Sequence, residues 1–426
     1  ERRAPEELPR TNPPQAALPY DVNFEKIDVP ALPDARPTAI SNVNLVHLFD
    51  DHRMDLLACD MRRGQILVLQ PYAPQPAWRV LYSPGPDKGF NPAHAEVVDL
   101  DGDGIKDILV ANLGSFSPTD LRKGSVLWLR GNSDGKTFTP YTLLENVGRV
   151  ADVQAAHFRD PDKLDLVAGV FGWRNTGEIL LLENETTDWT APKFVPRVLD
   201  YRHGTIHVPV ADLNKDGKPD FVALISQEHE TVVAFINEGN GKFRKDTLYE
   251  APHPAYGSSG IQLADLNDDG RLDVLYTNGD TLDKPYLLKP YHGVQWLENR
   301  GLDDDGRMKP FELHPLTPMY GVHRALAVDF SGTGRKDIVC VGFLPEEGFP
   351  KRKEMNLDAV VVLEQTKPGH FERHSLETGT CDHVTCAAGD IFGSGRNDLV
   401  IGNFFSGKAE NAVTIWKNLG RKARDP

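Results

Sequence analysis

The sequence lacks several features that mark common classes of protein. It has only 4 cysteines in 426 residues, and no two of them have the Cys-x-x-Cys spacing of zinc sites and redox centres. No apolar run approaches the length needed to cross a membrane. No Gly-x-Ser-x-Gly or His-Glu-x-x-His motif is present. The sequence therefore argues against a membrane span, a thiol redox centre and the common hydrolase motifs.

Basic residues are also outnumbered. Lys and Arg total 47 against 62 Asp and Glu, which gives a net charge of −15. Such a chain is a poor partner for nucleic acid or for an anionic membrane surface. Cys59 and Cys340 lie in apolar strand patterns and are predicted to be buried thiols. Cys381 and Cys386 are close enough in sequence to form a disulfide, which the sequence leaves open.

What the sequence does contain is a repeated acidic turn between two apolar strands. Three copies are complete, two are weakened, and two keep only the closing aspartate. The seven copies close at Asp55, Asp107, Asp165, Asp220, Asp273, Asp337 and Asp398. These positions are 52 to 64 residues apart. A regular period of this kind indicates a repeat architecture.

Each repeat carries four strand signals, and the fourth opens on an aromatic residue. Short, evenly spaced strands indicate an all-β protein, and four per repeat are typical of propeller blades. The last repeat lacks its fourth strand, whereas a matching segment starts at Phe24. The sequence therefore predicts an all-β, seven-bladed β-propeller of four-stranded blades over residues 23–420, closed by an N-terminal strand that completes the last blade. Residues 1–22 are predicted to be a proline-rich arm, and residues 421–426 a C-terminal tail.

The turn Asp-x-Asp-x-Asp-Gly-x-x-Asp, followed by an apolar strand, resembles the FG-GAP/VCBS repeat. Phe171 and Gly172 even keep the dipeptide that gives the family its name. The resemblance covers residues 24 to about 420 and implies a propeller with calcium in its loops. Members include integrin α-subunit heads, fungal lectins, polysaccharide lyases and sugar dehydratases. The family therefore does not select one activity.

The complete turns have the ligand pattern of a calcium site, because oxygen side chains at every second position suit a hard cation. The expected ligands are Asp99, Asp101, Asp103, Asp107, Asp212, Asn214, Asp216, Asp220, Asp265, Asn267, Asp269 and Asp273. About three structural Ca²⁺ ions would brace the blades. The alternative is a hydrogen-bonded turn without an ion. That alternative is favoured for the copies at Asp329 and Asp390, where other residues replace carboxylates.

The residues at the start of the inner strands, and those in the loops between second and third strands, should gather at the opposite face, around the axis. Those predicted to be catalytic are His94, His207, Arg324, His323, Asp152, Tyr286 and Tyr291. Those predicted to bind substrate are Trp173, Arg174, Asn112, His383, His229 and Asn278. His94, Asp152, His207 and Arg324 occupy equivalent positions, together with Asn42, Gly260 and Thr385. The alternative is that the histidines only satisfy backbone groups in the channel.

Three functions remain open. The leading hypothesis is a β-eliminating polysaccharide or glycoside lyase, or a sugar dehydratase, which needs a base, a cation and an acid. His94 or His207 would be the base, Arg324 would stabilise the enolate, and Tyr286, Tyr291 or another histidine would be the acid. The second hypothesis is a non-enzymatic glycan- or protein-binding propeller. The third hypothesis is a protein that holds a transition metal with the histidines at this axial face, the mouth of the central channel.

The sequence also leads to expectations about location and partners. The chain begins at Glu1 rather than at a methionine, as it would after removal of a signal peptide. Together with the calcium sites, this favours a secreted or periplasmic protein. The expected partner is carbohydrate, and the expected state is a monomer. The binding residues differ from blade to blade, which favours one asymmetric pocket over the repeated sites of a lectin.

Overall fold

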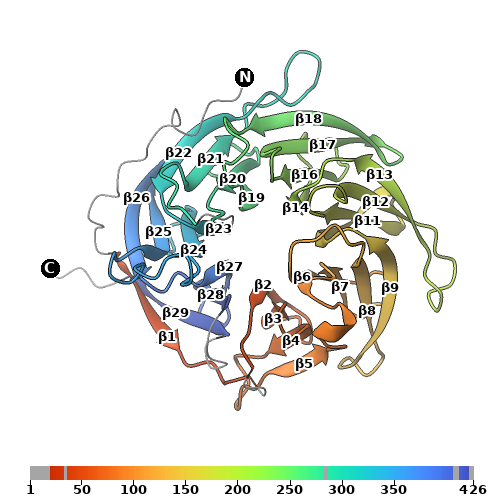
Figure 1. The fold of residues 1–426 in the computed structure, drawn as a ribbon, viewed down its shortest axis with the longest axis horizontal. Helices are drawn as coiled ribbons and strands as arrows, with labels where there is room; N and C mark the ends of the chain where they lie inside the picture. Colours follow the sequence, from red (N-terminus) through yellow and green to blue (C-terminus); the bar gives the residue numbers. More distant parts are fainter. Residues whose placement is uncertain (1–19, 33–35, 283–285, 406–411, 422–426) are drawn as a thin grey trace.

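The structure is a computed structural model that describes residues 20–32, 36–282, 286–405 and 412–421. These residues form seven antiparallel sheets arranged around a central axis (Figure 1). The first strand of each blade lies beside the axis and the fourth lies at the circumference. The prediction of an all-β, seven-bladed propeller is confirmed.

The blades follow one another in chain order, and each runs from the axis outward. The first three are β2 (Ile40–Val46), β3 (Asp55–Asp60), β4 (Gln65–Leu69), β5 (Arg79–Tyr82); β6 (Pro92–Val98), β7 (Asp107–Asn112), β8 (Gly124–Gly131), β9 (Phe138–Val147); and β10 (Val150–Asp160), β11 (Lys163–Val170), β12 (Glu178–Asn184), β13 (Phe194–Asp200). The next two are β14 (Thr205–His207) with β15 (Val210–Ala211), β16 (Asp220–Ile225), β17 (Thr231–Gly239), β18 (Lys242–Glu250); and β19 (Gly260–Ala264), β20 (Asp273–Thr277), β21 (Gly293–Glu298), β22 (Glu312–Pro318). The last two are β23 (Val322–Val328), β24 (Asp337–Gly342), β25 (Asp358–Lys367), β26 (His370–Thr378); and β27 (His383–Gly389), β28 (Asp398–Asn403), β29 (Val413–Arg421), β1 (Val22–Ile27). A 3₁₀ turn, η2 (Pro86–Lys88), precedes β6.

The ring is closed by the two ends of the chain. Strand β1 pairs antiparallel with β29 and completes the seventh blade, as predicted. Tyr20, just before β1, donates a hydrogen bond to Asp337 of the sixth blade at 3.1 Å. The rest of the predicted arm, residues 1–19, and the predicted tail from residue 422 lie outside the described residues.

The core lies between neighbouring blades. All residues of β7 and β16 are buried, because each second strand has a strand on either side and another blade over each face. A strand buried on both faces must be apolar throughout, which accounts for its continuous hydrophobic pattern. The inner strand of the fourth blade is split into β14 and β15 at Pro209, which has no N–H to give to the ladder.

The closing aspartates are part of this framework. Asp107 is fully buried, and its two carboxylate oxygens accept hydrogen bonds from Leu100 N at 2.9 Å and Gly131 N at 2.7 Å. The same pair of backbone bonds, from the turn and from the third strand, recurs at Asp220, Asp273, Asp337 and Asp398. Each carboxylate therefore ties its turn to the third strand of its own blade.

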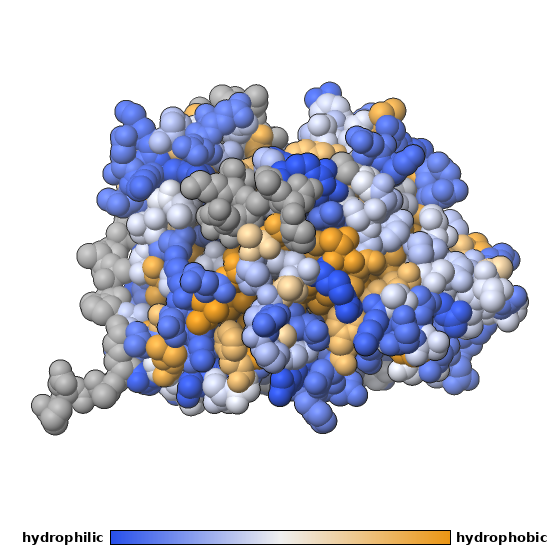
Figure 2. All heavy atoms as spheres, turned by 90° about the horizontal axis from the view of Figure 1, so that it is seen from below, coloured by the Kyte–Doolittle hydropathy of each residue, from blue (hydrophilic) through white to orange (hydrophobic). Residues whose placement is uncertain are grey.

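The remaining general features follow from this packing. All four cysteines are buried and free, so Cys381 and Cys386 form no disulfide and the predicted burial of Cys59 and Cys340 is confirmed. Seen from the side, hydrophilic residues gather toward the upper end of the ring and apolar residues lie mainly across its middle (Figure 2). Among the described residues, no helix has the length and apolar character that crossing a membrane requires.

Candidate functional site

The site is built from the first residues of the inner strands. In six of these strands, as far as they are described, the pairing register shifts at the same point. The residues that follow the shift are Asn42, His94, Asp152, His207, Arg324 and Thr385. A bulge bends the strand and redirects the side chain after it. The positions that the sequence makes equivalent are therefore equivalent in the structure.

The exception is the fifth blade, which has Gly260 at this position and a regular register. A β-carbon at Gly260 would lie 2.9 Å from the carbonyl oxygen of His323 and 3.5 Å from Cδ of Arg324. The missing side chain leaves the space that Arg324 crosses to reach the fifth blade, where its Nη1 donates to Ile261 O at 2.8 Å.

Four of these side chains form one chain of contacts across the mouth. His94 Nδ1 lies 2.9 Å from Asp152 Oδ1, and His207 Nδ1 lies 3.9 Å from Asp152 Oδ2. On the other side of His207, its Nε2 lies 3.2 Å from Arg324 Nη1. Backbone N–H of Val208 donates to Asp152 Oδ2 at 2.8 Å and fixes the carboxylate. The structure therefore brings together the predicted residues His94, Asp152, His207 and Arg324.

The contacts set the charge of each group. Burial opposes ionisation of Asp152, but the nearby His94 and His207 outweigh it and hold the pKa of Asp152 well below its ordinary value. Burial likewise disfavours charged His94, but Asp152 outweighs burial and raises the pKa of His94. Burial and then the Arg324 charge lower the pKa of His207 to about 4. Two histidines on one carboxylate thus differ: His94 is readily protonated and His207 is neutral.

These residues line a cavity of about 600 Å³ at the axial mouth. Its lining includes the cationic side chains of Arg149 and Arg324 and the carboxylates of Asp152 and Asp280. The predicted residue His323 also lines it. Glu96 lies two residues beyond His94 on the same strand, and burial raises the pKa of its carboxyl to about 7. When protonated His94 neutralises Asp152, the two arginines outnumber the one remaining carboxylate, Asp280, so the cavity is weakly cationic although the whole chain is acidic.

An aromatic cluster also borders the cavity, and no pattern in the sequence predicts it. Phe116 and Phe404 stack with ring centroids 6.2 Å apart, and Phe405 contacts Phe404 edge-on at 4.3 Å. The guanidinium of Arg62 lies 4.8 Å from the Phe405 ring centroid. All three phenylalanines line the cavity, and Phe116 and Phe405 are each 36% exposed. Phe116 contacts the segment that follows the second strand of the last blade, and this contact depends on closure of the ring.

Several predicted residues lie away from the cavity lining. Tyr291 is buried, stacks on Tyr256 and donates to Ala255 O at 3.1 Å, while Tyr286 packs on Phe349. The structure therefore does not bring either tyrosine to the histidines as an acid. The side chains of Asn112, Asn278 and His383 are buried and hydrogen-bond to neighbouring loops and strands, and the Arg174 guanidinium lies 4.4 Å from the Trp173 ring centroid. His229 lies in a different cluster, with His203 and Glu228.

The first predicted cation loop brings three carboxylates together. One oxygen each from Asp99, Asp101 and Asp103 lies within 4.8 Å of the others. Arg130 Nη2 lies 2.5 Å from Asp101 Oδ2 and 3.5 Å from Asp103 Oδ2, which places a positive charge beside the loop. The equivalent loops at Asp212 and Asp265 have the same turn, in which the first aspartate accepts hydrogen bonds from the backbone N–H groups of the turn. The side-chain oxygens of these three loops suit a hard cation such as Ca²⁺.

The histidines predicted to hold a transition metal at the axial mouth do not belong to a compact group of three ligand atoms. Among the described residues, three groups of His, Cys, Asp or Glu place three ligand atoms within 4.8 Å, and none contains His94 or His207. Arg324 also puts a positive charge against Nε2 of His207.

A ring of seven four-stranded blades, with acidic turns at one face and an axial cavity containing charged side chains at the other, defines a repeat-type β-propeller. Residues 212–276 match the FG-GAP-like repeat. This segment contains two of the three complete acidic turns. The repeat and the closed ring of seven blades both support the predicted resemblance to FG-GAP propellers.

Comparisons with individual proteins agree with the propeller fold. The chain is 24% identical to integrin alpha-4 of Xenopus laevis over 285 residues, or 62% of this chain. The match spans 26% of that protein, so the chain corresponds to about a quarter of its length. Among solved structures, chains in two crystals of BBS1N in complex with ARL6DN, soaked with lead or with mercury, superpose with a TM-score of 0.51. Each is 15% identical, and the superposition covers 94% of this chain and 98% of the other, which shows a shared fold.

Proposed function

We propose that the axial cavity binds an acidic carbohydrate and that the protein is a carbon–oxygen lyase acting on it by β-elimination. The observation that carries this proposal is the His94–Asp152 pair, which shares one cavity with Arg324. A histidine held by a buried carboxylate is a common form of general base. The volume of about 600 Å³ is in the range of small-ligand sites.

The charge and shape of the cavity support an anionic sugar. Arg149 and Arg324 place two guanidinium groups in the cavity of a molecule whose net charge is −15, so an anionic group can bind there although the chain as a whole repels anions. The exposed faces of Phe116 and Phe405 offer apolar surfaces against which a sugar ring can stack. A uronic acid has both features, a carboxylate and a ring with an apolar face.

The proposed reaction assigns one role to each group. Neutral His94 removes the proton from the carbon next to the sugar carboxylate, and Arg324 stabilises the negative charge that moves onto that carboxylate. The electron pair of the broken C–H bond forms a C=C bond, and the adjacent C–O bond breaks toward its oxygen. His94, now protonated, returns the proton to that leaving oxygen. No separate tyrosine acid is needed when the proton and the leaving group lie on the same side of the ring.

The test is incubation with a panel of uronic-acid polysaccharides, followed by ultraviolet absorbance of the unsaturated product. His94→Ala should lower the rate by about 10²–10⁴-fold, the usual contribution of a general base. His314→Ala is a matched control, because His314 lies outside the cavity and pairs with Glu298 at 2.8 Å. The rate should rise with pH through the raised pKa of His94, since only its neutral form accepts the proton. Absence of unsaturated product across the panel contradicts the lyase proposal.

A non-enzymatic binding propeller is the second candidate, and the similarity to an integrin alpha-4 segment favours it. In that case the same cationic cavity and phenylalanine surface hold an acidic glycan or an acidic protein segment without reaction. Saturable binding of a uronic-acid oligosaccharide in calorimetry, with no product and with unchanged affinity in His94→Ala, would establish binding in place of catalysis.

We further propose that the loops at Asp99, Asp212 and Asp265 hold Ca²⁺ and brace the blades. The converging oxygens of Asp99, Asp101 and Asp103 support this assignment, as does the turn that the three loops share. Calcium concentrations outside the cytosol would keep such sites filled, which agrees with a secreted or periplasmic protein. Removal of calcium should lower the melting temperature, and readdition should restore it.

A further inference from the structure

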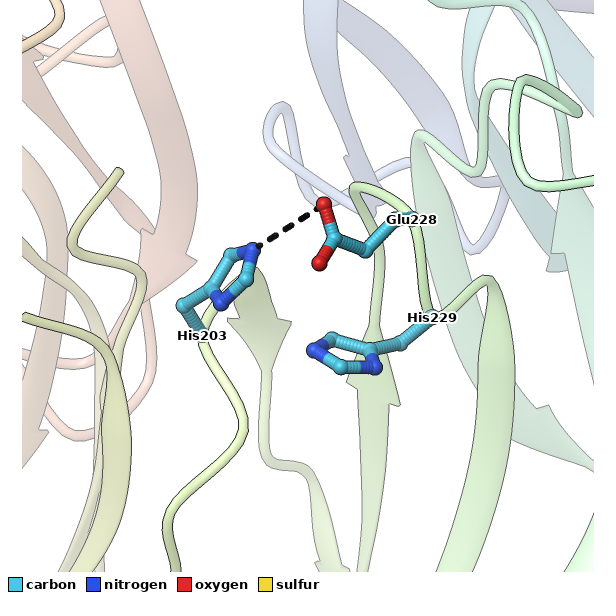
Figure 3. A group of neighbouring side chains, drawn as sticks. All are labelled: His203, Glu228 and His229. Atoms are coloured by element: carbon cyan, nitrogen blue, oxygen red, sulfur yellow. Dashed lines mark ion pairs between the residues drawn. The ribbon is translucent and has the colours of Figure 1, made fainter. Parts of the chain in front are cut away.

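A second group of potential ligands lies beside the cavity, in the fourth blade. His203 comes from the segment before β14, and Glu228 and His229 come from the turn between β16 and β17 (Figure 3). His203 Nε2 lies 3.8 Å from Glu228 Oε2, and the two imidazole centroids are 4.9 Å apart. One nitrogen of each histidine and one oxygen of Glu228 all lie within 4.8 Å of one another.

The backbone that carries these side chains is firmly held. Gly204 O accepts hydrogen bonds from Ser226 N at 2.8 Å and Ser226 Oγ at 3.0 Å, which joins the two loops. Gln227 and Glu230, on either side of Glu228 and His229, have left-handed φ angles of 58° and 44°. A non-glycine residue adopts this conformation at an energetic cost and keeps it where its surroundings impose it.

Glu230 supplies such a constraint. Its carboxylate is buried and accepts a hydrogen bond from Ser258 N at 2.8 Å, and Ala251 N donates to its backbone oxygen at 2.9 Å. On the other side, Gly177 makes room for His203, because a β-carbon at 177 would lie 2.2 Å from the His203 Cα. The two histidines are therefore presented on a fixed frame, and Glu228, with a side chain 69% exposed, can adjust.

The basic side chains near this group pair with a different carboxylate, that of Asp200. The guanidinium of Arg202 binds Asp200 through two bonds of 3.0 and 2.8 Å, and Lys245 binds the same carboxylate at 2.9 Å. The group of Glu298, Glu312 and His314 differs in this respect. There, Arg300 Nη1 lies 3.2 Å from Glu298 and 3.4 Å from Glu312, so a side-chain cation already stands between the carboxylates.

We propose that His203, Glu228 and His229 bind a divalent transition-metal ion, with zinc as the ion that fits best. Two imidazoles and one carboxylate form a zinc ligand set that leaves a fourth position open. Ligand bonds of about 2.0–2.2 Å require the three atoms to approach a little more closely, which rotation of the exposed Glu228 side chain provides. Ser226, two residues before Glu228, lines the axial cavity, so the ion lies at the rim of the proposed binding site.

The test measures zinc binding by the full chain. Bound metal ions are first removed with a chelator, and millimolar calcium is then returned to occupy the acidic loops before zinc is added. Elemental analysis should find one retained zinc per chain, and the His203→Ala and His229→Ala variants should lose it. Glu228→Gln should weaken zinc binding more than about tenfold, and because the Glu228 side chain is exposed, this variant should keep the fold. His314→Ala, from the group already occupied by Arg300, should keep the zinc.

A spectroscopic measurement completes the experiment. Cobalt(II) substituted for zinc should give visible absorption of a low-coordinate site, and His229→Ala should abolish it. Failure of the wild-type chain to retain zinc would overturn the proposal, as would full retention by the His203→Ala/His229→Ala double variant. Unchanged zinc affinity in Glu228→Gln would overturn the three-ligand site. None of these results depends on lyase activity, so this proposal and the proposed function can fail separately.

Discussion

Replacing Asp152 with asparagine removes one charge from the centre of the axial cavity while keeping the size of the side chain. At the 2.9 Å that separates His94 Nδ1 from Asp152 Oδ1, and an effective dielectric constant of about 20, the Coulomb attraction is about 6 kcal/mol. Desolvation of both groups offsets part of this attraction. Removing one partner of a buried pair costs about 3–5 kcal/mol. We expect Asp152→Asn to lower the free energy of unfolding by that amount near pH 6.

The pH dependence gives the prediction a clear sign. Asp152 has a depressed pKa, so its contribution to stability is lost as pH falls through that pKa. His94 has a raised pKa, so its contribution is lost as pH rises through that pKa. The variant should lose both dependences, since asparagine does not ionise and burial, together with the Arg324 charge, then lowers the pKa of His94 against the weaker opposing effect of Glu96.

The assay is denaturant unfolding from acid to alkaline pH, together with NMR titration of the His94 imidazole. Asp246→Asn is the control, because Asp246 is also buried and pairs with arginines outside the cavity. The control should lose stability but leave the His94 titration unchanged. A His94 pKa that stays raised in Asp152→Asn would refute the reasoning, whatever the effect on stability.

Other perturbations test separate parts of the structure. Burial raises the pKa of Glu96, so its ionisation destabilises the fold. Glu96→Gln should therefore gain stability relative to the wild type as pH rises between about 4.5 and 7. Unfolding curves at both ends of this range measure the difference. Gly260→Ala should displace Arg324 and cost about 1–3 kcal/mol, because the new β-carbon would lie 2.9 Å from the His323 carbonyl oxygen. Thermal unfolding measures the loss of stability, and ligand calorimetry measures the effect of displacing Arg324. Calcium at 100 times its dissociation constant should stabilise the wild type by about 2.7 kcal/mol per site. Asp101→Ala should lose the stabilisation from one site, whereas Asp390→Ala should lose none. An equal calcium response in all three proteins would contradict the assignment of the loops.

The sequence predicts the architecture well because each sequence repeat corresponds to one structural unit. Each closing aspartate comes before a strand buried on both faces, and its position defines a blade without any knowledge of tertiary contacts. The place of β1 beside β29 follows from the count of fourth strands. The same alignment brings His94, Asp152, His207 and Arg324 to one mouth, because equivalent positions in a ring meet at its axis.

The rest of the site depends on contacts that the repeat does not encode. Tyr291 was expected at the mouth because it follows a second strand, but the following loop folds back and buries the ring against Tyr256. His229 was expected in the axial site and lies with His203 instead, since the turn at Gln227 directs it there. Phe116 and Phe404 lie almost 300 residues apart and meet only after the ring has closed.

Strand β1 also has a consequence for the order in which the molecule forms. Its partner β29 lies nearly 400 residues later, so this pairing is among the most non-local contacts in the chain. During synthesis, β1 emerges first and has no partner until the last blade has been made. The entropic cost of closing so long a loop grows slowly with length, but the pairing must still come late. Loss of residues 22–27 should therefore expose β29 as an open edge able to pair with another chain.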